Sequence, residues 1–77
     1  MEKKAIEKQI AEIEKRLKEG SLDKENREIW IGLEYLYSLL NPERYSEQQL
    51  EDLRRLKLEL NFDENIALDA WLKERML

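Results

Sequence analysis

The sequence predicts a single all-α domain of about four helices over residues 1–77: a long charged first helix, a central apolar second helix and two shorter C-terminal helices. Apolar residues recur at helical spacing, and no segment alternates with the period of two that marks a half-buried strand. Charged and hydrophobic residues each make up 42% of the chain, which has one Pro and two Gly, a balance typical of amphipathic helices.

The first helix is predicted over residues 2–19, and Gly20 is expected to end it because Gly tolerates the left-handed conformation that follows a helix. An apolar seam runs along it at heptad-like spacing. Two heptads are too short for a stable isolated coiled coil, so the seam should pack either on the rest of the domain or on a second copy. The seam consists of Ile6, Ile10, Ile13 and Leu17.

The second helix is expected to begin after Ser21 or Asp23, either of which can cap its free N–H groups, and to end before Pro42. It is apolar around most of its circumference, so the rest of the domain should surround it. Gly32 in its interior costs about 1 kcal/mol relative to Ala, which predicts that another backbone crosses closely there.

The third helix begins with a capping box, in which Ser46 is followed three residues later by Gln49. Asn61 is its predicted C-terminal cap. The leucine spacing predicts an inner face made of Leu50, Leu53, Leu56 and Leu60.

The fourth helix is predicted to start at Asp63, whose carboxylate can cap it, and to continue to Leu77. Its apolar residues spread over more than one face, and a terminal helix with such surplus apolar surface is expected to meet a partner. Trp71 is the expected anchor, with Leu68 and Leu72 beside it. Glu47 and Glu51 are expected to belong to an acidic rim around that anchor.

A homodimer is also expected, because a core of this size is marginally stable and a chain without Cys or His gains neither a disulfide nor a typical zinc site. We expect it to form through the first helix, the last helix or both.

No residue is predicted to be catalytic, to bind a cofactor or to ligate a metal. The chain lacks both His and Cys, the side chains that most often carry nucleophilic or proton-transfer chemistry near neutral pH. Its carboxylates are better explained by helix capping and solubility. Arg54, Arg55 and Lys57 form a basic cluster among acids, which predicts a solvated helix face. The chain is therefore expected not to be an enzyme.

The net charge is −4, and residues 46–77 hold eight acids against five bases. An acidic domain repels phosphate backbones, so nucleic-acid binding is disfavoured and a protein with a basic surface is the expected partner. No apolar run approaches the ~18 residues of a membrane span, and the N-terminus lacks the apolar stretch of a signal peptide. We expect a cytoplasmic protein without a membrane partner.

Several short motifs follow one another over residues 30–76. LLNPER at residues 39–44 joins a leucine pair to a proline turn and leads into YSE, LEDLRRLKLEL follows at residues 50–60, and NFDENIAL follows at residues 61–68. In this order they resemble the MerR-like proteins, and more closely their chaperone-modulator branch. The resemblance implies a helical fold and, in that branch, binding to J-domain co-chaperones. The Gly expected before the leucine pair is absent, and residues 2–19 lie outside the family pattern.

The sequence thus favours a non-enzymatic protein-interaction module, acting as a regulator, modulator or adaptor. The alternatives are a dimeric MerR-like DNA-binding transcriptional regulator and a structural or phage-type assembly protein. The first alternative is weakened by the second helix, whose basic residues are only Lys24 and Arg27, too few for reading a DNA groove.

Overall fold

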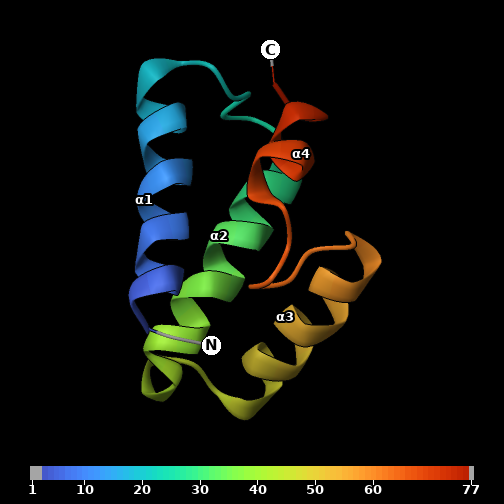
Figure 1. The fold of residues 1–77 in the computed structure, drawn as a ribbon. Coiled ribbons are helices and arrows are strands. Elements are labelled where there is room, and N and C mark those ends of the chain that lie inside the picture. The colour runs from blue at the N-terminus through green and yellow to red at the C-terminus, as the bar shows by residue number, and fades with distance from the viewer. Residues whose placement is uncertain (1–2, 77) are drawn as a thin grey trace.

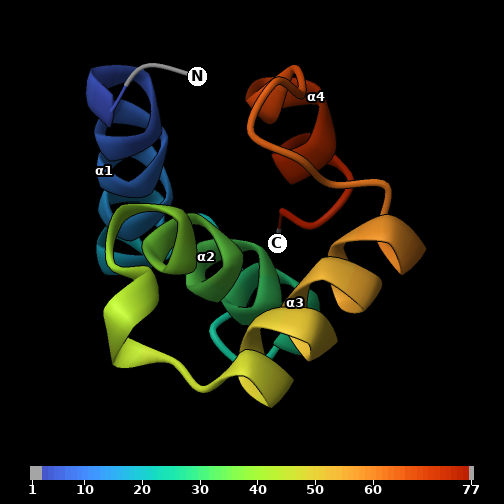
Figure 2. The same cartoon turned by 90° about the horizontal axis from the view of Figure 1, so that it is seen from below.

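The structure, a computed structural model, describes residues 3–76, and these residues form the all-helical domain that the sequence predicts. α2 runs through the middle of the molecule, between α1 on one side and α3 and α4 on the other (Figure 1, Figure 2). None of the helices in the described part of the chain combines the length and the apolar composition needed to cross a bilayer. The elements are α1 (Lys3–Glu19), α2 (Arg27–Leu40), the 3-10 helix η1 (Pro42–Arg44), α3 (Glu47–Glu59) and α4 (Leu68–Lys73).

α1 ends as predicted, because Gly20 adopts a φ of 82°. The N–H of Ser21 donates to the carbonyl of Arg16 and the N–H of Gly20 to that of Leu17, the pair of bonds that defines a Schellman turn. The predicted start of this helix at Glu2 lies outside the described residues. All four residues of the isoleucine seam are buried in the domain core.

α2 begins later than predicted, and its cap is neither Ser21 nor Asp23. Asn26 is the cap, with its side-chain oxygen accepting from the N–H of Glu28. Ser21 instead donates its hydroxyl to the carbonyl of Arg16, and Asp23 accepts from the N–H of Glu25. Both short polar side chains stabilise the turn after α1. The same turn buries the side chain of Leu22, and the backbone of Leu22 pairs with that of Met76. α2 ends before Pro42, as predicted.

α3 confirms the predicted capping box: Ser46 accepts from the N–H of Gln49, and Gln49 accepts from the N–H of Ser46. Its other end is a second Schellman turn, in which Asn61 has a φ of 55° and the N–H of Phe62 donates to the carbonyl of Lys57. The predicted inner face is only partly right. Leu53 is buried, whereas Leu50, Leu56 and Leu60 are half-buried.

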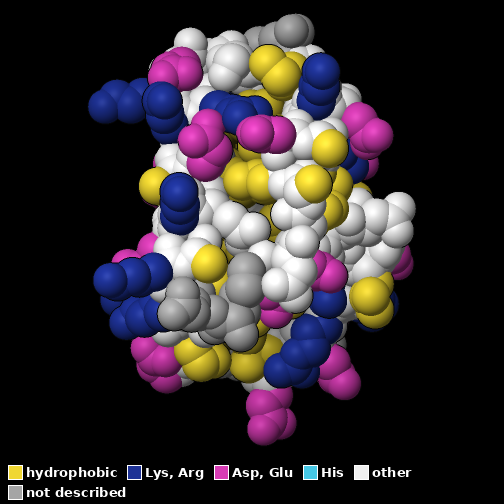
Figure 3. All heavy atoms as spheres, in the orientation of Figure 1, with side chains coloured by type: hydrophobic (Ala, Val, Ile, Leu, Met, Phe, Trp, Pro, Cys, Tyr) yellow, Lys and Arg dark blue, Asp and Glu magenta, His cyan; other side chains and the backbone are white. Residues whose placement is uncertain are grey.

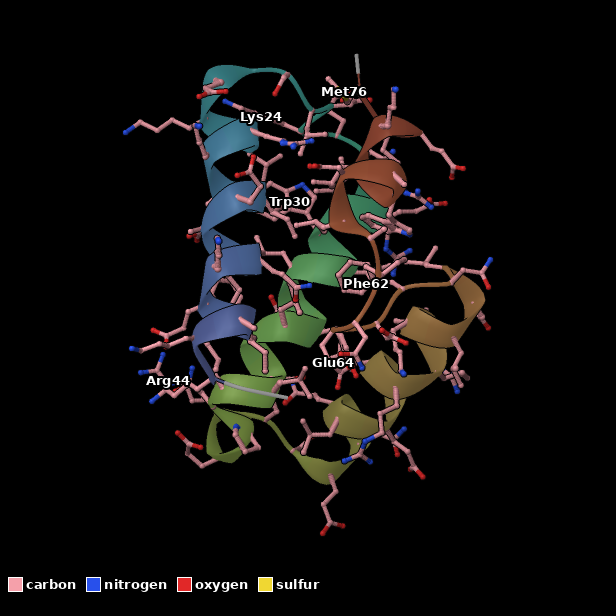
Figure 4. The ribbon with its side chains drawn as sticks, in the orientation of Figure 1. Lys24, Trp30, Arg44, Phe62, Glu64 and Met76 are labelled. Carbon is pink, nitrogen blue, oxygen red and sulfur yellow. The ribbon has the colours of Figure 1, made fainter. Side chains whose placement is uncertain are left out.

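α4 does not start at Asp63. The Asp63 carboxylate accepts from the N–H of Asn65, and its carbonyl accepts from that of Ile66, which closes a local turn in place of a helix. The helix begins only at Leu68, after Ala67, which makes no side-chain cap. The segment between α3 and α4 crosses α2, and Phe62 and Glu64 extend from it toward that helix (Figure 4). The predicted end at Leu77 lies outside the described residues.

Gly32 does mark a close approach, but side chains approach it and not another backbone. A Cβ at this position would lie 3.3 Å from Cη2 of Trp71 and 3.4 Å from Cε2 of Phe62. The bare helix surface at Gly32 therefore receives two aromatic rings.

Because Leu36 is fully buried at the centre of α2, we expect Leu36→Ala to lower the free energy of unfolding by about 2 to 5 kcal/mol. Urea unfolding followed by circular dichroism would measure this loss. Leu58→Ala is the matched control, since Leu58 is 68% exposed and its truncation should change stability by no more than about 0.5 kcal/mol. Equal losses in the two variants would contradict a core centred on α2.

Candidate functional site

Trp71 and Leu72, predicted to anchor a partner, are instead part of the core. Trp71 is 5% exposed and Leu72 is fully buried. The indole ring packs on Phe62, with centroids 4.7 Å apart, and its N–H donates to the carbonyl of Leu60 at 3.0 Å. The prediction failed because a two-faced helix does not reveal from sequence what covers its second face.

Arg75 covers the second face of α4. Its guanidinium carbon lies 3.8 Å from the centroid of the Trp71 ring, at cation–π distance. The same guanidinium pairs with Glu28 of α2 at 2.9 Å and donates to the carbonyl of Trp71. The C-terminal segment thus seals the indole from solvent with one of its own charged side chains.

The isoleucine seam is equally unavailable to a second copy in this fold, because α1 packs it on α2. Of the two alternatives for the seam, the structure shows the first. The remaining predicted contact residues lie elsewhere: Leu68 is half-buried beside α1, while Glu47 and Glu51 are exposed on the first turns of α3. The structure therefore does not gather the predicted partner-binding residues into one patch.

Polar contacts bridge the depression of about 450 Å³ between α1 and α4. Leu68 and Ala5 contribute to its wall, and hydrophobic side chains are visible between the two helices in Figure 3, with charged side chains around them. Arg16 bridges across it, with an ion pair to Asp69 and a 2.8 Å bond to Glu12. Gln9 donates to the carbonyl of Glu64 at 2.9 Å. These bonds pair several polar groups of the depression within the chain, whereas the buried Oε1 of Gln9 has no hydrogen-bond partner among residues 3–76.

A larger hollow of about 510 Å³ lies between the C-terminal half of α2 and α3, and we call it the α2–α3 groove. Its apolar walls come from Leu39 and Pro42 on one side and from Leu50 and Leu58 on the other. Leu58 is the most exposed large hydrophobic residue of the described chain. The complete lining is Tyr35, Ser38, Leu39, Pro42, Leu50, Arg54, Lys57 and Leu58.

Two cations face this groove although the chain as a whole is acidic. The lining contains Arg54 and Lys57 but no acid. Neither forms an ion pair with any residue between 3 and 76, whereas the neighbouring Arg55 pairs with Asp52. Lys57 instead places its ammonium 5.4 Å from the centroid of the Tyr35 ring. The groove therefore has two positive charges free to meet an anionic group.

Acids border the same groove at the other end of α3. A smaller hollow next to it shares Leu50 and Arg54 with the groove and adds Glu47 and Glu51. The midpoint of the two acids and the midpoint of the two cations are roughly 10 Å apart along the helix, at 1.5 Å of rise per residue. The outer face of α3 is thus negative at its N-terminal end and positive at its C-terminal end.

The sequence indicated Glu47 and Glu51 as contact residues but gave no sign of the groove. The basic cluster was expected to be a solvated helix face, and Leu50 was expected in the core. One spacing pattern could have revealed a second face on this helix. Arg54, Lys57 and Leu58 follow Leu50 by four, seven and eight residues, which places all four on one side of the helix. Nothing in the sequence showed that Leu39 and Pro42 would form the opposite wall.

The groove lining includes one serine, Ser38. Ser38 is buried and donates its hydroxyl to the carbonyl of Tyr35 at 2.6 Å. Within residues 3–76 no three side chains of the metal-ligating types come together. The groove offers apolar surface and charge, which suit binding.

No protein-family model, no curated protein and no solved structure matched this chain. The resemblance to MerR-like chaperone modulators therefore stays a prediction from sequence.

Trp71→Ala is expected to lower the free energy of unfolding by about 3 to 5 kcal/mol, since it removes a buried indole and its hydrogen bond. Trp30→Ala is the control of the same residue type, because Trp30 is 46% exposed and should cost clearly less. Urea unfolding of both variants measures the difference. A Trp71→Ala protein as stable as the wild type would contradict its place in the core.

The three tyrosines are expected to ionise above their ordinary pKa of 10. The Tyr37 hydroxyl donates to Glu14, which raises its pKa to about 12. Burial is the main cause that raises the pKa of Tyr35 and of Tyr45, and hydrogen bonds to Glu64 and Glu34 add to it. Ultraviolet difference absorbance during an alkaline titration measures these transitions.

Because the pKa values of the tyrosines are raised in the folded protein, the stability of the fold should fall at high pH. The neutral Tyr37 contributes stability that is complete below pH 10 and is lost as the pH rises through about 12. Tyr37→Phe should make this loss smaller. A folded protein whose tyrosines all titrate with midpoints at or below pH 10 would contradict these hydrogen bonds.

Proposed function

We propose that the chain is a small protein-interaction module, a modulator or adaptor, that acts by binding and without catalysis. The α2–α3 groove carries this proposal, because it joins apolar walls, an exposed leucine and unpaired charge in one concave surface. Grooves of this kind commonly receive the apolar face of an amphipathic helix. The partner's helix lies along α3, with its apolar residues between Leu39 and Leu58.

The charges of α3 define the chemistry of the partner more closely. Glu47 and Glu51 favour basic residues on one end of the docked helix, which agrees with the basic surface expected from the sequence. Arg54 and Lys57 favour an acidic residue on its other end. The partner segment therefore has both signs of charge, about two turns apart, beside an apolar stripe.

A DNA-reading role for α2 has no comparable support. The exposed residues of this helix are Arg27, Trp30 and Glu34, a set with one cation and one anion. A helix that enters the major groove needs several side chains that reach phosphates or base edges. Tight binding to duplex DNA at physiological salt is accordingly not expected.

Capture from a cell lysate followed by mass spectrometry tests the proposal with three baits: the wild type, Leu58→Asp and Met76→Ser. Met76 is also exposed and apolar but lies at the opposite end of the molecule from α3's first turn (Figure 4). Proteins captured by the wild type and Met76→Ser but lost with Leu58→Asp depend on the groove. If both variants capture the same proteins as the wild type, the groove is not the binding surface.

With such a partner purified, Leu58→Asp is expected to weaken the complex by about 1 to 4 kcal/mol, mainly through faster dissociation, because Leu58 is the exposed apolar residue of the groove. The double change Glu47→Lys with Glu51→Lys is expected to slow association and to reduce its dependence on salt. Biolayer interferometry at several ionic strengths separates the two effects. Unchanged rates in both variants would argue against this function.

A further inference from the structure

α3 is an edge helix. Its main neighbour is α2, α1 lies on the other side of α2 in both ribbon views (Figure 1, Figure 2), and α4 contacts the C-terminal end of α3 through Trp71. Spacings of three and four residues place one set of side chains on the side of α3 that turns from the core toward the groove. The members of this set, which we call the outer face of α3, are Glu47, Leu50, Glu51, Arg54, Lys57 and Leu58.

The outer face of α3 is electrically neutral, and its acids precede its bases along the helix. It contains two acids followed by two bases, whereas the whole chain has a net charge of −4. An order of acids first and bases last is self-complementary when two identical helices lie antiparallel, because each acidic end then meets a basic end. The net charge of −4 on each copy opposes association, whereas the charges of this face favour it.

We propose that this protein forms a two-fold symmetric homodimer in which the outer face of α3 packs antiparallel on the outer face of α3 from a second copy. Each copy inserts its exposed Leu58 toward the α2–α3 groove of the other. The two α2 helices flank the paired α3 helices, which gives a four-helix arrangement around the symmetry axis.

The heptad spacing of the face sets the register of the pair. Residues 47 and 54 are seven apart and occupy one heptad position, and residues 50 and 57 occupy a second heptad position. In antiparallel packing, a residue at the first position lies opposite a residue at the second position of the other helix. Glu47 then lies opposite Lys57 of the second copy, and Leu50 lies against the aliphatic stem of Arg54 of the second copy. Symmetry repeats each contact. Glu51 is within reach of Arg54 of the second copy, which pairs all the charges of the face.

Charge complementarity selects a second copy as the occupant, and the exposed leucine supplies the apolar contact. α3 has 13 residues, about 20 Å of helix, so the interface is at the small end of stable interfaces and self-association is expected at micromolar concentrations. This inference does not need the proposed function, although it concerns the same groove. A dimer covers the groove, so a foreign helix has to displace the second copy in order to bind.

A charge-exchange experiment tests the dimer with two single variants, Glu47→Lys and Lys57→Glu. In either variant alone, like charges face each other twice across the symmetry axis, and the dissociation constant should rise by about tenfold or more. Mixing the two variants should restore wild-type association, because both lysines of the first variant then face the two glutamates of the second. The double variant should also dimerise on its own. Sedimentation equilibrium measures all four samples.

Glu7→Lys and Lys15→Glu are the matched controls, since both residues are exposed on α1, and they should leave the dimer intact. Circular dichroism of every variant separates lost folding from lost pairing, and recovery on mixing can arise only from contacts between chains. A wild type that stays monomeric up to high micromolar concentration overturns the proposal. So does a mixture that fails to dimerise while the wild type does, or a pair of controls that weaken the dimer as much as the α3 variants.

The dimer and the protein partner can fail separately. A monomeric wild type that still captures proteins through Leu58 would retain the proposed function and exclude the dimer. A dimer that responds to the charge exchange, with no groove-dependent protein captured, would do the reverse.

Discussion

Two aromatic rings resting on the bare backbone of Gly32 hold the C-terminal third of the chain in place. Any larger residue at that position would bring a Cβ within 3.3 Å of Trp71 and 3.4 Å of Phe62. Tyr35 then meets Phe62 edge-on, with centroids 6.2 Å apart, so a second residue of α2 contacts the same pair. The loss of helix propensity at Gly32, about 1 kcal/mol, is offset by the burial of both rings.

The same contact explains how such a short fourth helix can exist. α4 has six residues and no side-chain cap, far below the length at which an isolated helix is stable. Trp71 ties it to the end of α3 through the carbonyl of Leu60, and Arg75 ties the following turn to Glu28. Tertiary contacts and not helix propensity therefore determine this element. Its surface has little apolar area left for a partner, whereas α3 exposes Leu58.

The sequence predicted those features whose cause is local or periodic. The isoleucine seam, the stop at Gly20 and the capping box at Ser46 each follow from spacing or from one residue's chemistry, and the structure has all three. The errors arose where several polar residues compete for one role. Asp63 can cap a helix or close a turn with equal chemistry, and only the path of the chain across α2 decides for the turn.

The candidate site was harder to predict, because a groove is a property of two elements together. Leu50 and Leu58 could be assigned to a face of α3, but the wall opposite them exists only after the proline turn brings α3 back beside α2. Trp71 was hard to predict for another reason: its burial depends on Phe62, in the segment before α4, and on the way Arg75, four residues later, folds over the ring.

α3 lies between two turns whose backbone conformations are restricted in different ways. On one side Pro42 fixes its own φ within a 3-10 turn, and on the other Asn61 occupies a left-handed conformation that a non-glycine residue adopts only at some expense. α3 has one main neighbour and one buried leucine, and a turn lies at each of its ends. It is therefore the segment most easily released without unfolding α1 and α2. Its amide hydrogens should exchange with solvent sooner than those of α2. The part of the molecule that carries the proposed recognition surface is thus also the part whose order a bound ligand can most increase.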